Sequence, residues 1–202
     1  MHIQMVRLFK KNHKISKEEW FKIFNEIRYT PSSFDLQPWR FFIIDNETSK
    51  NKLKNIVQGN KAQLETSSAV VLICGNLNKV NSAEYIYNKK YINNEITHEQ
   101  KENFLKTIKN HYNKINYTRL QNEVFFEAGI IALHFILTLQ DFDYSCCFIG
   151  GFSFEKINNI FGISQDYVPV ILLSVGKKTI ISNNLEKTKK FKFNIDDFVF
   201  FL

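Results

Sequence analysis

The chain has 202 residues, of which 44% are hydrophobic, and it carries a formal net charge of +7. A chain of this length and composition can bury one core, so we expect a single domain over residues 1–202 and exclude a disordered chain. Because the lysines are spread along the chain, the charge indicates a solvated surface and not a nucleic-acid partner.

The cysteines lie in or beside apolar runs and lack metal-ligand spacing, so we expect buried, reduced thiols and no metal site. They are Cys74, Cys146 and Cys147. The longest apolar run, residues 124–139, is interrupted by Glu127 and is shorter than the about 20 residues that a membrane span requires. No basic and apolar leader precedes the first helix, so we predict a cytoplasmic protein without a membrane segment.

The first predicted element is a helix that begins after Ser16, because Ser16 to Glu19 has the Ser-x-x-Glu form of a capping box. Pro31 ends it, and a polar turn runs from there to Trp39 and into an apolar strand over residues 40–45. Two of the three prolines lie in this turn, so it presents hydrogen-bonding groups from a stiff backbone. Its composition alone is also that of an ordinary helix-to-strand loop.

A second helix is predicted from Asn46 to near Gly59. Its buried stripe comprises Leu53, Ile56 and Val57. A polar turn over residues 60–63 follows, and the β-branched apolar run over residues 69–74 predicts a strand buried on both faces.

Residues 77–117 are rich in Asn, Lys, Tyr and Glu and carry a second capping signal at residues 97–100. They predict a pair of polar helices inserted into the domain. The insert is either a solvated surface addition to the fold or a lid that sets substrate size, and the sequence leaves both possibilities open.

Residues 118–140 are apolar nearly all round, which predicts a central helix buried on most faces that also contributes to a subunit interface. Gly129 within it predicts a close helix–helix approach, and His134 is interpreted as a hydrogen-bonded core residue. A strand is then predicted over residues 144–152, which ends in paired glycines.

A short helix, residues 153–162, and a last strand, residues 168–176, complete the order of an α+β fold with one sheet and helices packed around it. The tail is basic and then ends in the apolar residues 198–202, which predicts docking on a partner subunit. The residues themselves form no acid, base and nucleophile constellation, so an enzyme with this inventory would take its chemistry from a cofactor.

The order Pro31-Ser32-Ser33-Phe34-Asp35-Leu36-Gln37-Pro38-Trp39, followed by an apolar strand, resembles the signature loop of the flavin-dependent nitroreductase family. Residues 127–137 resemble the family's central helix, and residues 147–152 resemble its second flavin-contacting segment, so the likeness spans nearly the whole chain. It implies a nitroreductase-like fold with one central, mainly antiparallel sheet. It also implies a homodimer whose C-terminal extension packs on the partner subunit, tightly bound FMN, NAD(P)H as reductant, and residues 77–117 as a possible lid over the flavin.

The resemblance also implies which residues contact the FMN, in part across a dimer interface. Those of the signature loop are Pro31, Ser32, Ser33, Asp35 and Gln37. Backbone amides near flavin N5 and O4 come from Ile149, Gly150 and Gly151, where a missing Cβ lets the backbone approach a flat ring closely.

The other implied contacts come from Asn60 and Gln63 near the ribityl chain or the pyrimidine edge, although ordinary helix capping is the alternative for these two. Arg7 corresponds to a cation near flavin N1 and O2. Lys190 and Lys192 correspond to a basic pair at the phosphate.

Three positions depart from the family pattern. Asp35 stands where relatives carry Asn, and it loses an NH2 donor. Ile3 and Met5 stand where relatives carry an Arg and a Ser that hold the phosphate.

The resemblance implies an oxidoreductase in which NAD(P)H gives a hydride to flavin N5 and an electron-poor small molecule, such as a nitroaromatic or a quinone, takes up the electrons. No side chain is predicted to be catalytic. The alternative, suggested by the departures, is a flavin-binding or interaction protein with little or no turnover. A third reading is a reductive enzyme for one specific metabolite.

Overall fold

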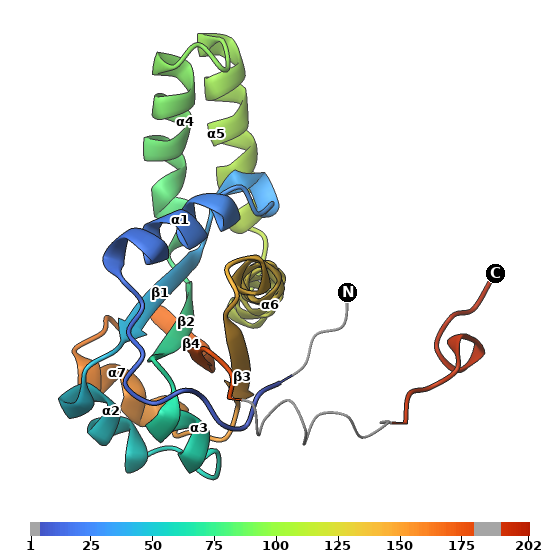
Figure 1. Ribbon diagram of the computed structural model, residues 1–202. Helices are drawn as coiled ribbons and strands as arrows, with labels where there is room; N and C mark the ends of the chain where they lie inside the picture. Colours follow the sequence, from blue (N-terminus) through green and yellow to red (C-terminus); the bar gives the residue numbers. More distant parts are fainter. Residues whose placement is uncertain (1–4, 180–190) are drawn as a thin grey trace.

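The computed structural model describes residues 5–179 and 191–202 (Figure 1). The α-helices are α1 (Lys17–Ile27), α2 (Glu47–Lys54), α3 (Lys61–Thr66), α4 (Ala83–Ile92), α5 (His98–Tyr112), α6 (Tyr117–Asp141) and α7 (Phe154–Phe161). The strands are β1 (Trp39–Ile44), β2 (Ala69–Asn76), β3 (Ser145–Ile149) and β4 (Tyr167–Gly176). Short 3-10 helices are η1 (Ser33–Asp35), η2 (Lys79–Ser82) and η3 (Ile195–Asp197).

The strands form one sheet in the order β1-β2-β4-β3, and every neighbouring pair is antiparallel. All eight residues of β2 are buried, which confirms the predicted strand covered on both faces. The β2–β4 register shifts after Ile73, next to Pro169, which has no N–H to offer to the ladder. The predicted α+β architecture with a mainly antiparallel sheet is therefore confirmed.

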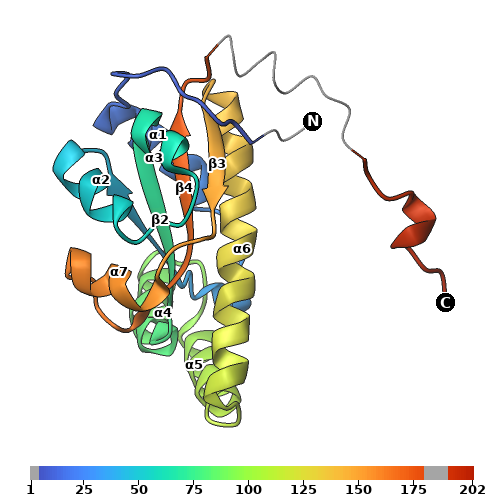
Figure 2. The same cartoon turned by 90° about the horizontal axis from the view of Figure 1, so that it is seen from below.

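Alternate residues of β2 point to two separate cores, as the pleat of a strand requires. Val71 and Ile73 pack with α1 and α6 on one face of the sheet. Val70 and Leu72 pack with α2, α3 and α7 on the other. The sheet is thus the middle layer between two layers of helices (Figures 1 and 2).

Helix α6 runs along the sheet beside β3 (Figure 2). It has 25 residues, more than the apolar run within it, and by length and composition alone it could cross a membrane. Its buried side includes Ile131 and Phe135, which pack in the core between the sheet and α1, so α6 is a core helix of this domain. The opposite side is open, contrary to the prediction of burial on most faces, and exposes Phe126 and Leu133.

Two local predictions need correction. Helix α2 ends at Lys54, and Val57 lies beyond it because its backbone forms a bridge with Phe152. Residues 61–63 are the first turn of α3 and not a free turn. Asn60 is the N-cap residue of this helix, but it adopts the left-handed conformation (φ 47°) and its side chain makes no capping hydrogen bond.

The insert is a hairpin of α4 and α5 that stands out from the end of the sheet where β1 begins (Figure 1). Both predicted polar helices are present, and Thr97 forms the predicted capping box with Gln100. At the base of the hairpin, Tyr87 and Ile108 pack against Leu36, which belongs to the turn before β1.

The C-terminal segment 191–202 lies apart from the sheet and its helices in both views (Figures 1 and 2). Its apolar side chains, including Phe198, Phe200 and Phe201, are exposed. No part of the described protomer covers them.

Candidate functional site

The signature loop, residues 31–39, adopts an unusual backbone conformation. Phe34, Asp35 and Gln37 have positive φ angles of 51°, 53° and 48°. Left-handed backbone is uncommon for residues other than glycine and costs on the order of 1–3 kcal/mol for each residue held in such a sparsely populated conformation. The loop keeps this shape only because the surrounding structure determines it.

Contacts within the loop fix part of this shape. The amide of Gln37 donates to the Ser32 hydroxyl across 3.0 Å. The Arg40 guanidinium donates to the carbonyls of Gln37 and Trp39, at 3.2 and 2.7 Å. The side chain of Gln37 turns back to donate to the Asp35 carboxylate across 3.2 Å.

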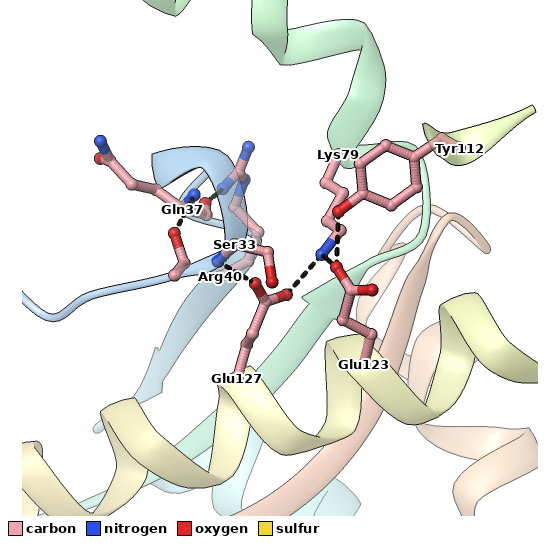
Figure 3. Close-up of polar contacts among 8 residues, drawn as sticks. Ser33, Gln37, Arg40, Lys79, Tyr112, Glu123 and Glu127 are labelled. Atoms are coloured by element: carbon pink, nitrogen blue, oxygen red, sulfur yellow. Dashed lines mark hydrogen bonds and ion pairs between the residues drawn. The ribbon is translucent and has the colours of Figure 1, made fainter. Parts of the chain in front are cut away.

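Three further contacts hold the loop from outside. The Ser33 amide donates to Glu127 Oε1 on α6 across 2.7 Å (Figure 3). From α4, the Tyr87 hydroxyl donates to the carbonyl of Phe34 across 3.1 Å. Also from α4, Lys90 Nζ lies 2.7 Å from Asp35 Oδ2. Partial burial alone would lower the pKa of Lys90, but the hydrogen bond and charge of Asp35 outweigh it and raise that pKa.

Behind Glu127 lies a buried ionic group that sequence reasoning missed. Lys79 is completely buried, and its Nζ donates to Glu123 Oε1 at 2.5 Å and to Glu127 Oε2 at 2.6 Å (Figure 3). The Tyr112 hydroxyl also donates to Glu123 Oε1, at 2.5 Å. We call Lys79, Tyr112, Glu123 and Glu127 the buried ionic cluster.

The pKa values of the cluster follow from these contacts. Burial would raise the pKa of Glu123, but hydrogen bonds from Lys79 and Tyr112 outweigh burial and lower it. Burial and the adjacent Glu123 carboxylate raise the pKa of Tyr112, which therefore stays protonated as a donor. The one sequence signal was two glutamates four residues apart on an otherwise apolar helix, which lie on the same side of that helix.

A second group of predicted residues lies around α3 and the end of β3. The amide of Val6 donates to the Cys146 carbonyl across 3.0 Å, which attaches the segment that carries the exposed Arg7 to the sheet edge. Burial raises the pKa of the Cys147 thiol, while Gln63 and Arg7 act on it in the opposite direction. Arg7 and Gln63 are therefore neighbours of Cys147.

The paired glycines after β3 differ in how much space surrounds the position of a Cβ atom. The Gln58 amide donates to the Gly151 carbonyl across 2.6 Å, and a Cβ at Gly151 would lie 2.9 Å from the Gln58 carbonyl oxygen. Packing therefore explains Gly151. A Cβ at Gly150 would meet only the Ile171 side chain, at 3.8 Å, among the described atoms. The exposed backbone at Gly150 therefore has the room that a flat ligand needs to approach it.

The signature loop and the neighbourhood of Arg7 and Gln63 lie at different ends of β1. The signature loop leads into Trp39, and α2 and α3 follow Ile44 (Figure 1). A strand of this length spans about 17 Å at the ~3.4 Å rise of antiparallel strands. One protomer therefore brings together Ser32, Ser33, Asp35 and Gln37 at one end of β1, and Arg7 and Gln63, beside Cys147, at the other. The end of β3 lies between them, because the strand register places Ile149 level with Phe42 in the middle of β1.

The remaining predicted residues are placed only in part. Ile3 and Lys190 lie outside the described residues. Met5 forms an isolated parallel bridge with Cys146, and Lys192 is exposed in the C-terminal segment. Among residues 5–179 and 191–202, no group of His, Cys, Asp or Glu could hold a metal ion.

A cavity of about 590 Å³ lies between the signature loop and α4. Its lining includes Pro31, Asp35 and Gln37 from the loop and Lys89 and Lys90 from the insert. This volume is in the range of small-molecule sites.

The sequence pattern of the Nitroreductase family matches residues 4–177 of this chain. A curated relative, YdgI of Bacillus subtilis, provisionally named as an NAD(P)H nitroreductase, is 34% identical over 165 residues, which cover 81% of this chain and 79% of YdgI. The CLA biosynthesis enone reductase of Lactiplantibacillus plantarum is 28% identical and covers 85% of this chain and 80% of its own length.

A solved structure from Exiguobacterium sibiricum, provisionally described as a nitroreductase in complex with FMN, has a TM-score of 0.92 at 30% identity. It covers 99% of this chain and 93% of its own chain. The family pattern, the curated relatives and the solved structure agree with the fold, and this chain belongs to the Nitroreductase family.

Proposed function

We propose that this protein is an NAD(P)H-dependent FMN oxidoreductase that reduces an electron-poor small molecule. The observation that carries the proposal is the signature loop. It is held in a strained conformation by contacts from α4 and α6, and it lines a cavity of about 590 Å³. A stiff, polar loop beside a cavity of this size provides the fixed hydrogen-bonding groups that a flat cofactor requires.

The protein acts as a homodimer in this proposal. The open side of α6 exposes Phe126 (69%) and Leu133 (50%), and Gly129 lies between them with no described atom within 4 Å of its absent Cβ. An apolar helix face with a glycine at its centre fits the close approach of a second copy. The apolar residues 198–202 would cover the partner, and the two partial sites would meet across the interface.

The residues around β3 fit FMN in charge and shape. Arg7 is exposed and makes no ion pair with a described residue, so its charge is available to an anionic ligand. A cation near flavin N1 and O2 stabilises the reduced, anionic ring. The backbone from Ile149 to Gly151 would face the N5 side, with Asn60 and Gln63 at the ribityl chain or pyrimidine edge, and Lys190 and Lys192 would hold the phosphate.

Bound FMN would supply the hydride chemistry, and the chain would bind, orient and exclude water. The insert would serve as a lid, because Lys89 and Lys90 of α4 line the cavity beside the loop. Nitroaromatics and quinones are the proposed acceptors, and the relative named as an enone reductase adds α,β-unsaturated ketones to the panel worth testing. The cytoplasmic location stays a prediction.

A second candidate is a flavin-binding protein with little turnover. The ion pair between Asp35 and Lys90 favours it, because the carboxylate is already engaged and offers no NH2 donor to a flavin.

The test begins with protein purified without added flavin. Its absorption spectrum is recorded, and any chromophore is released by acid and identified. Anaerobic titration with NADH or NADPH should bleach the flavin, and addition of a nitroaromatic or a quinone should restore its colour. A yellow protein that neither nucleotide bleaches would support the second candidate. A colourless protein that does not take up FMN would overturn both.

A further inference from the structure

The buried ionic cluster is an unusual choice for the interior of a small domain. Lys79 is fully buried, and the side chains of Glu127 and Glu123 are only 2% and 12% exposed. Taking charges out of water costs free energy that their mutual attraction does not always recover, and apolar residues of similar volume often serve stability as well. The cluster therefore calls for an explanation other than stability.

The two oxygens of Glu127 have different partners. Oε2 accepts from Lys79, and Oε1 accepts from the amide of Ser33 in the signature loop (Figure 3). Lys79 is in turn fixed by Glu123, whose Oε1 also accepts from Tyr112. This chain of contacts leaves Glu127 one orientation, in which Oε1 faces the loop.

The insert, residues 77–117, supplies two members of this chain. Lys79 lies on η2 and Tyr112 at the end of α5, whereas both glutamates lie on α6. The insert also reaches the loop directly, through Tyr87 and Lys90 of α4. The signature loop is thus held between the central helix and the insert.

We infer that Glu127 and Lys79 are positioning residues of the signature loop, and that the insert sets the geometry of this loop in addition to any role as a lid. Three left-handed residues other than glycine persist in the loop because these contacts determine it. Neither residue needs to touch the flavin or a substrate. The inference rests on the proposed function for its effect on FMN, but its effect on the loop is independent of FMN.

The test is hydrogen exchange of the full-length protein without flavin, followed by mass spectrometry of peptides that cover residues 30–38. Glu127→Leu removes the acceptor of the Ser33 amide and leaves Lys79 paired with Glu123. Glu127→Gln keeps one acceptor oxygen, which can serve the Ser33 amide or Lys79 but not both, because the NH2 group accepts from neither. We expect the leucine variant to raise exchange in this peptide at least about tenfold, and the glutamine variant to lie between it and the parent.

Glu19→Gln is the matched control, because Glu19 accepts from the Tyr144 hydroxyl much as Glu123 accepts from Tyr112, but far from the loop. It should leave exchange in residues 30–38 unchanged. Parent-like exchange in the Glu127→Leu variant would overturn the inference. If that variant also raised exchange in β2, Ser33→Pro would decide, because it removes the amide and leaves the cluster intact. Raised exchange confined to the loop supports the inference, and no change overturns it.

Binding of FMN by fluorescence quenching separates this inference from the proposed function. We expect the Kd of the Glu127→Leu variant to rise at least about tenfold, with an intermediate value for the glutamine variant and a near-parental value for the Glu19 variant. A parent protein that binds no FMN would overturn the proposed function while the exchange experiment still decides the positioning role. A parent that binds FMN, but no more tightly than the leucine variant, would overturn the inferred effect of loop positioning on FMN binding.

Discussion

The carboxylate of Asp35 lies 2.7 Å from the ammonium of Lys90, so the signature loop is tied to the insert at the position where the family commonly carries asparagine. Both side chains are partly exposed, at 45% and 24%. An ion pair this accessible contributes about 0–1 kcal/mol to folding, so its main effect is on the site.

Asp35→Asn should therefore change the free energy of unfolding by less than about 1 kcal/mol. It should tighten FMN binding about threefold to tenfold, because it adds an NH2 donor and removes a negative charge beside an electron-rich cofactor. Urea denaturation and FMN titration measure the two effects. Lys90→Met, which breaks the same ion pair without adding a donor, should weaken FMN binding. An Asp35→Asn variant that binds FMN more weakly than the parent would show that the carboxylate suits the site.

Lys192→Met tests the proposed phosphate contact. Loss of one cation should weaken the binding of FMN about tenfold and leave the binding of riboflavin, which has no phosphate, within about twofold. Titration of both flavins against the same protein provides the internal comparison. An equal loss of affinity for FMN and for riboflavin would show that Lys192 does not contact the phosphate.

The three thiols should be unreactive in the folded protein. Burial raises the pKa values of Cys74 and Cys146 to about 12 and also raises that of Cys147. At pH 8 the reactive thiolate is therefore scarce, and access is blocked as well. Ellman's reagent should react slowly with the native protein and with three thiols after denaturation in guanidinium chloride. Cys147 should be the first to react, because Gln63 and Arg7 oppose the rise in its pKa.

Glu123 should contribute to the loss of stability in acid. Its pKa is lowered in the folded protein from an ordinary value of 4.5, so the folded state binds its proton less readily than the unfolded state does. Its contribution is present above that value and is lost as the pH falls through the folded pKa. Glu123→Gln keeps an acceptor for Tyr112 and leaves Lys79 paired with Glu127. The free energy of unfolding of this variant should depend less on pH between pH 6 and pH 3 than that of the parent. If the free energies of unfolding of the variant and the parent changed with pH in the same way, Glu123 would not contribute to the acid loss of stability.

Gly129→Leu separates protomer stability from dimer formation. A Cβ added at this position has open space around it among the described residues, and replacing a glycine inside a helix stabilises that helix by up to about 1 kcal/mol. In the proposed dimer the leucine would hold two α6 helices apart. Sedimentation should show a weaker dimer, and Asn122→Ala, on the same exposed side of α6, should not weaken it. A Gly129→Leu variant that dimerises like the parent would place the interface elsewhere.

The sequence predicted helices and strands well where the spacing of apolar residues and the helix-capping residues indicated the same element. The Ser16 and Thr97 capping boxes, the buried strand over residues 69–74 and the hydrogen-bonded His134 are all confirmed, the last by a 2.7 Å contact with Thr30. Helix α3 was missed because its six residues are too few to show a helical period.

The site was harder to predict for a physical reason. A motif lists residues that are neighbours in sequence, but Ser33 and Glu127 are 94 positions apart and Lys79 and Glu127 are 48 apart. Glu127 interrupts an apolar run, and the pattern alone cannot say which lysine in the chain is buried against it. The resemblance likewise named the loop residues without indicating what holds their strained backbone.

The position of β2 has a consequence for synthesis of the chain. All eight residues of β2 are buried in the finished domain, yet β4, which pairs with it along its whole length, begins only at Tyr167. While the insert and α6 leave the ribosome, one edge of a largely apolar strand stays unpaired. Such exposed edges promote aggregation until the distant partner arrives. The nascent chain should therefore depend on chaperones during this interval, and a ribosome-bound chain that ends before β4 should be recovered mainly in association with them.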